Sequence, residues 1–238
     1  MKSIYINFFQ MFQQMKQDKM LIAISFVPFL TGLVFRFVIP LVENLLTNYF
    51  DVYEILQPYY PLFDLFLVII TPAMFNYVVA MVMLEEIDER ITTYLAITPL
   101  GKTGYLFSRL GFSGMMSFVV NIAVVMIFRL AQIDMLILVC VALVGAMQGV
   151  VIALLIIAVS ENKVEGMAIG KIASLFNMGA VIPYFITGNV QYLGAILPTF
   201  WIGKAMQTSN YFMLIVSFLL AAVWLVFLFK KFLLKING

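Results

Sequence analysis

Six long apolar runs constrain this chain more than any other feature of its sequence. A hydrocarbon core about 30 Å thick requires roughly 20 apolar residues in a helix, because lipid offers no partners for backbone polar groups and a helix satisfies its own. The runs cover approximately residues 20–39, 62–83, 110–128, 135–159, 167–187 and 211–229. The sequence therefore predicts an all-α polytopic membrane protein with six transmembrane helices, built as a single domain over residues 1–238.

Composition excludes several classes of protein. Hydrophobic residues make up 64% of the chain and charged residues 11%, too few polar side chains to cover a soluble domain, and a net charge of +2 does not suggest nucleic acid as a partner. The chain has no histidine and one cysteine, Cys140, so we expect no disulfide, no metal site and no histidine-dependent catalytic site. Asp64 and Asp134 are the candidates for a catalytic carboxylate pair. Both are expected at the outer membrane boundary, where a structural ion pair of Asp64 with Arg36 is the alternative.

Lysine and arginine are unevenly distributed between the two sides of the predicted membrane domain. One side carries Lys2, Lys16, Lys19, Arg90, Lys102, Arg109, Lys163, Lys171, Lys230, Lys231 and Lys235. The other side carries Arg36, Arg129 and Lys204, and its first loop is acidic. Because basic residues are retained on the cytoplasmic side, we predict a cell-membrane protein with both termini in the cytoplasm.

Residues 1–19 are predicted to form an amphipathic helix along the inner membrane interface. They lack the uninterrupted apolar core and cleavage site of a signal peptide. Their apolar side chains recur at helical spacing: Ile4, Phe8, Met11, Phe12 and Met15. A plain extension of the first span is the alternative. The chain is expected to turn into the membrane at Asp18 and Lys19.

The most charged part of the chain, residues 84–111, contains PLGKTG, which resembles a phosphate-binding loop. That motif requires a glycine where this chain has Ala96, and it requires a strand where ERITTYLA reads as helix. We therefore interpret GKT as a turn between two short helices, the first of which ends at Pro99. Negative charge favours a helix N-terminus, and the acidic residues predicted to begin that first helix are Glu85, Glu86, Asp88 and Glu89. A solvated cytoplasmic loop is the alternative.

The same segment resembles the cytoplasmic loop of type-2 ATP-binding-cassette (ABC) exporter permeases. The matching residues are Glu86 and Glu89 for an acidic stretch, Thr98, Pro99 and Leu100 for a turn, and Lys102 and Arg109 for basic residues that open the third span. Arg90 and Ile91 depart from the Gly-Thr that is common in the family. A second match, VIPYFITGNVQYLGAILPTFWIGKAM, resembles the outer segment that folds back into the membrane between spans five and six, with breaks at Pro183 and Pro198.

The resemblance implies a single transmembrane permease domain. Residues 1–19 would be its interfacial helix, residues 84–109 its coupling segment and residues 183–209 its outer re-entrant segment. Such permeases pair with a second permease, as a homodimer or heterodimer, and bind a cytoplasmic ABC ATPase that holds ATP and Mg, so this chain would bind no cofactor itself. The residues implied in ATPase coupling are Glu85, Glu86, Asp88, Glu89, Arg90, Thr98 and Pro99.

Small and amide residues inside the spans suggest how the helices associate. Gly145 with Gly149 and Gly166 with Gly170 form small-xxx-small patterns, which favour close helix packing over accidental placement. Carboxamides near the middle of spans must point into the protein: Asn76, Asn121, Gln148 and Asn177. One interpretation is that these amides form hydrogen bonds between helices. The resemblance places the transport path between spans two and five, which makes Asn76 and Asn177 the candidates for lining it.

The function expected from these features is ATP-driven export of an amphipathic or hydrophobic substrate. Two other classes stay open. A secondary transporter would need charged side chains at mid-membrane and paired broken helices. A non-transporting membrane component of an ATPase complex would share the features of an exporter permease.

Overall fold

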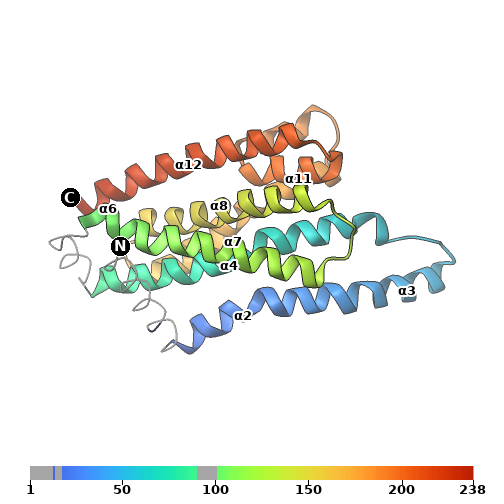
Figure 1. The fold of residues 1–238 in the computed structure, drawn as a ribbon, viewed down its shortest axis with the longest axis horizontal. Helices are drawn as coiled ribbons and strands as arrows, with labels where there is room; N and C mark the ends of the chain where they lie inside the picture. The colour runs from blue at the N-terminus through green and yellow to red at the C-terminus, as the bar shows by residue number, and fades with distance from the viewer. Residues whose placement is uncertain (1–12, 14–17, 90–100, 238) are drawn as a thin grey trace.

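The computed structural model describes residues 13, 18–89 and 101–237, and within these ranges every regular element is helical (Figure 1). Five stretches of helix are long and apolar enough to cross a membrane, and they span Lys19–Phe50, Gln57–Asp88, Gly104–Phe128, Met135–Val159 and Tyr211–Lys235. They run side by side as an elongated bundle. The predicted amphipathic helix over residues 1–19 lies almost entirely outside the described residues.

The elements alternate α-helices with short π-helical and 3₁₀ segments. In chain order they are α2 (Lys19–Leu33), the π-helical turn η1 (Val34–Val38), α3 (Ile39–Phe50), the 3₁₀ turn η2 (Gln57–Tyr59), α4 (Tyr60–Asp88), α6 (Gly101–Leu106), the π-helical turn η3 (Phe107–Gly111), α7 (Phe112–Phe128), α8 (Met135–Val159), α9 (Lys163–Ser174), the 3₁₀ segment η4 (Leu175–Ala180), α10 (Ile182–Phe185), the 3₁₀ segment η5 (Asn189–Ile196), α11 (Pro198–Thr208) and α12 (Tyr211–Asn237).

Helices α4 and α8 form the centre of the bundle, and α4 also contacts α2, α7 and α9. Glycines allow this close approach. A Cβ atom added to Gly149 would lie 2.6 Å from the Pro72 carbonyl oxygen on α4, and one added to Gly145 would lie 3.0 Å from the Val68 carbonyl oxygen. On α9, Gly170 faces the Tyr77 ring, and Gly166 faces a leucine of α4. Both glycine patterns therefore lie at helix contacts within the chain.

The first long helix extends beyond its predicted end at residue 39. α2, η1 and α3 continue one another to Phe50, and 32 residues of helix measure about 48 Å, more than a hydrocarbon core. The π-helical turn η1 ends two residues before Pro40, and such turns rearrange the backbone hydrogen bonds that proline cannot make. Glu43 folds the following loop back, since its carboxylate accepts hydrogen bonds from the backbone N–H groups of Ile55 (2.9 Å) and Leu56 (2.6 Å).

The predicted fifth span, residues 167–187, is not one continuous helix. α9 tightens at Leu175 into the 3₁₀ segment η4, and α10 follows as a single turn. Apolar composition alone suggested a span here, but the backbone is bent by local contacts. The Thr199 hydroxyl donates to the Phe176 carbonyl (2.6 Å), and a Cβ on Gly179 would lie 2.5 Å from that hydroxyl oxygen. α11 thus packs against η4, the segment in which the predicted fifth span departs from regular α-helix.

Candidate functional site

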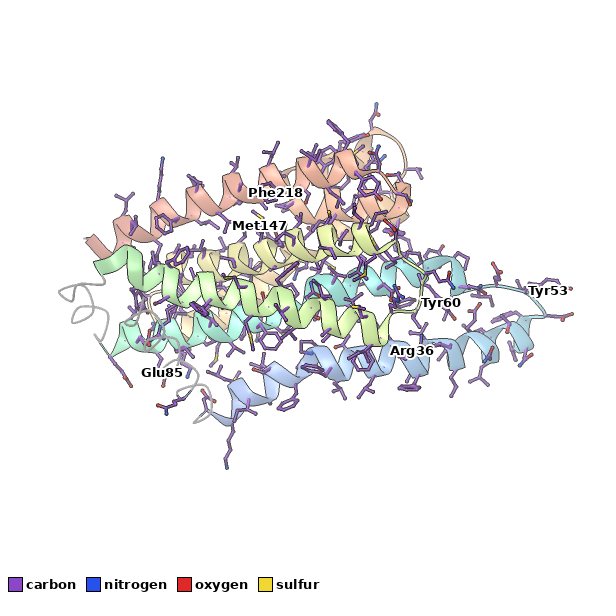
Figure 2. All side chains as sticks on the ribbon, viewed as in Figure 1. Arg36, Tyr53, Tyr60, Glu85, Met147 and Phe218 are labelled. Atoms are coloured by element: carbon purple, nitrogen blue, oxygen red, sulfur yellow. The ribbon has the colours of Figure 1, made fainter. Side chains whose placement is uncertain are left out.

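One end of the bundle gathers the start of α2, the end of α4, the starts of α6 and α9 and the end of α12. We call this the basal end; it lies on the left of Figure 1, and Figure 2 labels Glu85 there. The uneven distribution of lysine and arginine predicts that this end faces the cytoplasm. The predicted coupling segment, residues 84–109, begins at this end in α4 and ends there in η3.

The acidic run at the basal end does not begin a helix, contrary to the sequence-based prediction. Glu85, Glu86 and Asp88 lie in the last turn of α4, and Glu89 is its C-cap residue. Negative charge at a helix C-terminus is unfavourable to the helix dipole, so these carboxylates need cationic partners. The third long helix correspondingly begins at Gly101 in α6 rather than at residue 110.

A buried ionic triad joins α4 to the beginning of the third long helix. Glu86 forms an ion pair with the Arg109 guanidinium, whose Nε also donates to Glu86 Oε2 (3.2 Å). The Tyr105 hydroxyl donates to the same oxygen (2.6 Å). Glu86 is 1% exposed, Arg109 2% and Tyr105 2%. A two-pronged contact between guanidinium and carboxylate fixes orientation as well as charge, so α4 and α6–η3 are held in one arrangement.

A second, more exposed cluster centres on Lys163 at the start of α9. Its ammonium group donates to Asp18 Oδ2 (3.0 Å) and to Glu85 Oε2 (2.8 Å), and its backbone N–H donates to Asp88 Oδ2 (3.0 Å). The hydrogen bond from Lys163 is the main cause that lowers the pKa of Asp18. Partial burial opposes the charged form of Lys163, but hydrogen bonds to Glu85 and Asp18 outweigh it and raise the pKa of Lys163. Both shifts favour the charged forms of Asp18 and Lys163, so this ion pair is retained near neutral pH.

These two clusters tie together the basal ends of several helices. Asp18 is the N-cap of α2, and Lys235 of α12 donates to the carbonyl oxygens of Ile157 (2.8 Å) and Ser160 at the end of α8. The triad therefore connects α4 to α6–η3, and Lys163 connects α9 to α2 and α4.

The predicted coupling residues differ in accessibility. Glu86 is buried against Arg109, so it is placed to hold helices together rather than to touch a partner. Glu85 is half-exposed, whereas Asp88 and Glu89 are exposed. Three of the predicted coupling residues lie outside the described residues: Arg90, Thr98 and Pro99. Sequence reasoning did not single out Tyr105 or Lys163. One signal could have identified them: several carboxylates at one helix end require hydrogen-bond donors nearby.

At the opposite end, Asp64 does not pair with Arg36. Its carboxylate accepts the backbone N–H groups of Leu130 (2.8 Å) and Ala131 (2.8 Å), while Arg36 donates to the Arg129 carbonyl oxygen (2.9 Å). The ion pairs formed by the described residues do not include one between Asp64 and Arg36. Both side chains instead fasten the turn between α7 and α8, near Tyr60 in Figure 2. This leaves Asp64 bonded to backbone rather than poised for catalysis.

Asn76 is fully engaged in hydrogen bonds, one within α4 and two between α4 and α7. Its Nδ2 donates to the Pro72 carbonyl (2.8 Å) and to Ser117 Oγ (3.2 Å), and its Oδ1 accepts from the Ser113 hydroxyl (2.8 Å). Asn76 is 0% exposed. These contacts join α4 to α7 and support the packing interpretation of this residue.

Asn177 has a different environment, in the irregular segment η4. Its side-chain oxygen is buried and has no hydrogen-bond partner among the described residues, as is also the case for both amide atoms of Gln148. A buried amide without a partner carries a free-energy cost that a bound molecule or water can relieve. Asn177 therefore remains a candidate for lining a path.

We expect Asn76→Leu to lower stability without changing transport per folded molecule. Interhelical hydrogen bonds in membranes contribute about 0.6 kcal/mol each, and this variant loses two of them. Asn177→Leu is the matched control, because its side-chain oxygen has no hydrogen-bond partner among the described residues, and it should leave stability unchanged. Thermal unfolding in detergent and transport in vesicles measure the two effects. Equal loss of stability in both variants would contradict the assignment of Asn76 to packing.

Long apolar helices with buried polar contacts and charges gathered at helix ends define a polytopic membrane protein. Within that class, residues 11–229 match the family model described as "Fluoroquinolones export permease protein Rv2686c-like", and the chain belongs to this family.

Two curated relatives carry corresponding names. They are the fluoroquinolones export permease proteins MT2760 and Rv2686c of Mycobacterium tuberculosis, from strains CDC 1551 and H37Rv. Each is 25% identical to this chain over 155 residues, which are 64% of this chain and 62% of the relative. No solved structure matches the chain significantly.

Proposed function

We propose that this chain is the membrane-spanning subunit of an ATP-driven ABC exporter, coupled to a separate cytoplasmic ATPase and paired with a second permease. Family membership supports the exporter class. The observation that carries the coupling role is the ionic network at the basal end, which joins both sides of the 90–100 segment to the helices around it.

The proposed cargo is an amphipathic or hydrophobic molecule. The relatives are named as fluoroquinolones export permeases, and a fluoroquinolone is an amphipathic aromatic compound. ATP binding would bring the two ATPase subunits together, and their displacement would reach the membrane through residues 84–109. Because Glu86 and Arg109 lock α4 to α6–η3, the two helices would move as one body between two states of the bundle.

We further propose that α9, η4 and α10 make an interrupted sixth crossing and that α11 lies at membrane depth as part of a re-entrant segment. Irregular backbone at that depth is tolerated only when its polar groups are satisfied by protein. Here side chains donate hydrogen bonds to the backbone carbonyl groups of this segment. Besides Thr199, Trp201 donates to the Ala195 carbonyl (2.8 Å), Trp224 to that of Ile196 (3.1 Å) and Ser217 to that of Pro198 (2.7 Å).

The positions of buried charges favour the exporter over an ion-coupled secondary transporter. Among the described residues, the buried charged side chains are Glu43, Asp64, Glu86 and Arg109. Each lies near the end of a membrane-spanning stretch or beyond it and has protein partners. Ion coupling would instead be expected to use charge near the membrane midplane.

Glu89→Lys is expected to weaken ATPase association by roughly tenfold, a loss of about 1.4 kcal/mol. Glu89 is exposed at the basal end, and its side chain forms no ion pair with another described residue. Glu54→Lys is the matched control, because Glu54 is exposed in the first loop at the opposite end. Co-elution of the permease with the ATPase, followed by substrate-stimulated ATP hydrolysis, measures the effect.

Each contrary result points to a different conclusion. Unchanged association of Glu89→Lys would remove this residue from the coupling surface. Association without substrate-stimulated hydrolysis would favour a non-transporting membrane component. Proton-driven flux in the absence of ATP would overturn the exporter assignment.

A further inference from the structure

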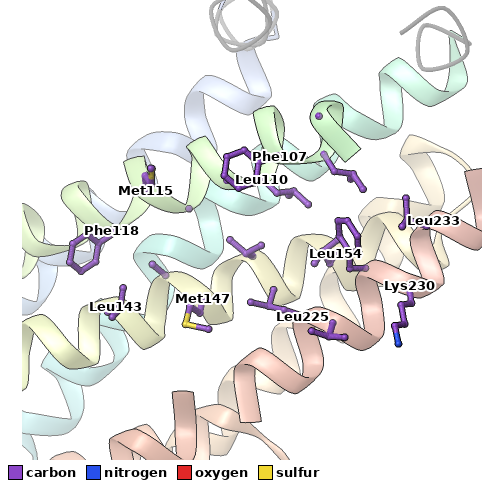
Figure 3. A pocket seen from close by; sticks show the side chains of 18 residues that line it. Phe107, Leu110, Met115, Phe118, Leu143, Met147, Leu154, Leu225, Lys230 and Leu233 are labelled. Atoms are coloured by element: carbon purple, nitrogen blue, oxygen red, sulfur yellow. The ribbon is translucent and has the colours of Figure 1, made fainter. Parts of the chain in front are cut away.

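An apolar groove opens on the side of the bundle between α6–η3–α7, α8 and α12 (Figure 3). Its volume is about 1030 Å³. Phe107, Met115, Leu143 and Val226 line it and are exposed, so the groove communicates with the surroundings of the bundle rather than with its core. It is separate from the ionic clusters of the basal end and from the polar contacts of Asn76.

The glycines of the third long helix leave the room for this groove. Gly104, Gly111 and Gly114 line it without contributing a side chain. At Gly114, α7 is in close contact with α8, since an added Cβ would lie 3.1 Å from Val150 Cγ2 on α8. At Gly111 the atoms nearest to an added Cβ belong to the Phe107 ring, at 3.5 Å. The absence of side chains at these three glycines leaves space in the groove between this helix, α8 and α12.

The groove extends over the depth of one lipid leaflet. On α8 it runs from Leu143 to Leu154, and these twelve residues of helix measure about 18 Å. Half of a hydrocarbon core is about 15 Å. Leu154 lies close to the basal end of α8 at Val159, and on α12 the groove reaches Leu233. The groove thus occupies the basal half of the membrane-spanning region.

One cationic side chain lines the basal part of this groove. Lys230 is the single charged residue that lines it, and it makes no hydrogen bond or ion pair with the residues that the structure describes. The carboxylates Glu85 and Glu86 at the end of α4 are engaged by Lys163 and Arg109. An apolar slot of one leaflet's depth with a free ammonium group at the headgroup level is complementary to an anionic lipid.

We propose that this groove binds an acyl chain of an anionic phospholipid from the basal leaflet, with the lipid phosphate at Lys230. The bound chain lies between α12 and the long helix that carries Arg109, so it stabilises the position of that helix relative to α12. This inference goes beyond the proposed function, because lipid binding requires neither cargo nor ATPase. Its failure would leave the exporter assignment intact.

The test uses photoactivatable lipid probes in vesicles of phosphatidylcholine that contain the full-length chain. The probes carry a diazirine in the acyl chain and have either a phosphatidylglycerol or a phosphatidylcholine headgroup, and labelled peptides are mapped by mass spectrometry. We expect the anionic probe to label groove peptides of α7, α8 and α12 about fivefold more than the zwitterionic probe, which corresponds to about 1 kcal/mol.

Two pairs of variants test the charge and the shape separately. Lys230→Gln is expected to abolish the preference for the anionic probe, whereas Lys231→Gln, an exposed neighbour that does not line the groove, should retain it. Met147→Trp fills the groove and is expected to reduce labelling by both probes. Leu136→Trp is its control, on an exposed position of the same helix outside the groove.

Three results would overturn the proposal. Equal labelling by the two probes would remove the role of charge. A preference that survives in Lys230→Gln would place the headgroup elsewhere. Label that falls mainly outside the groove peptides of the unmodified chain would exclude the site itself, and this last result does not depend on the folding of any variant.

Discussion

Arg109→Met is expected to destabilise the protein by about 3–5 kcal/mol, the cost typical of leaving one member of a buried ion pair without its partner. Glu86 is 1% exposed, so water cannot replace the guanidinium that the variant removes. Tyr105 would remain as a donor to Glu86, but one neutral hydrogen bond does not compensate a buried charge. The measurement is the melting temperature of the purified chain in detergent.

A double variant distinguishes the loss of the ion pair from the general effect of a substitution in the core. Glu86→Leu together with Arg109→Met removes both charges, and we expect it to recover most of the stability lost in the single variant. Lys171→Met is the control for loss of a basic residue, because Lys171 is exposed on α9. Equal destabilisation of the single and double variants would contradict an ion pair with a large interaction energy.

The same double variant addresses coupling. If Glu86 and Arg109 make α4 and α6–η3 move together, the double variant should fold and bind the ATPase, yet transport less per ATP hydrolysed. Unchanged transport by a folded double variant would restrict the pair to a structural role.

Gly149→Ala is expected to destabilise the contact between α8 and α4. Its Cβ would lie 2.6 Å from the Pro72 carbonyl oxygen and 2.8 Å from Asn76 Nδ2, so α8 would have to move away from the backbone of α4. Overpacking of this kind costs about 1–3 kcal/mol, and here it also disturbs the amide that joins α4 to α7.

Gly111→Ala is the matched control for that substitution. It adds the same methyl group to a helix in the same bundle, at a position where the nearest side-chain atom would be 3.5 Å away. We expect its melting temperature to stay within about two degrees of that of the unmodified chain, because the added methyl group would make only ordinary van der Waals contact. A similar loss in both variants would show that sensitivity at residue 149 comes from helix flexibility rather than from contact with α4.

The long, uniformly apolar spans were predictable because a membrane imposes length and composition directly on each segment. The span over residues 135–159 coincides with α8, and the one that begins at residue 211 begins α12. The first span was predicted too short: it was expected to end at residue 39, whereas the helix continues through a π-helical turn and Pro40 as far as Phe50. The fifth was predicted as continuous, because hydropathy measures composition and does not detect the contacts of Gly179 and Thr199 that bend the backbone.

The candidate site was predictable in location but not in arrangement. Sequence reasoning located an acidic segment next to the second span, and it identified Arg109 as a basic residue of the same region. It placed the carboxylates at the start of a new helix, whereas they end α4. The partners Tyr105 and Lys163 are 19 and 78 residues away from Glu86 and Glu85 in the chain, so no local pattern links them.

The sequence by itself determined that this chain is a helical membrane protein, that its charges collect at one end and that it resembles an exporter permease, because each of these depends on residue type and order along the chain. Only the tertiary structure decided which carboxylate is buried and which is exposed, which amide joins helices and which lacks a partner, and where a groove remains beside Lys230. Those properties depend on side chains from helices that are distant in sequence, and they are set by how the helices pack against one another.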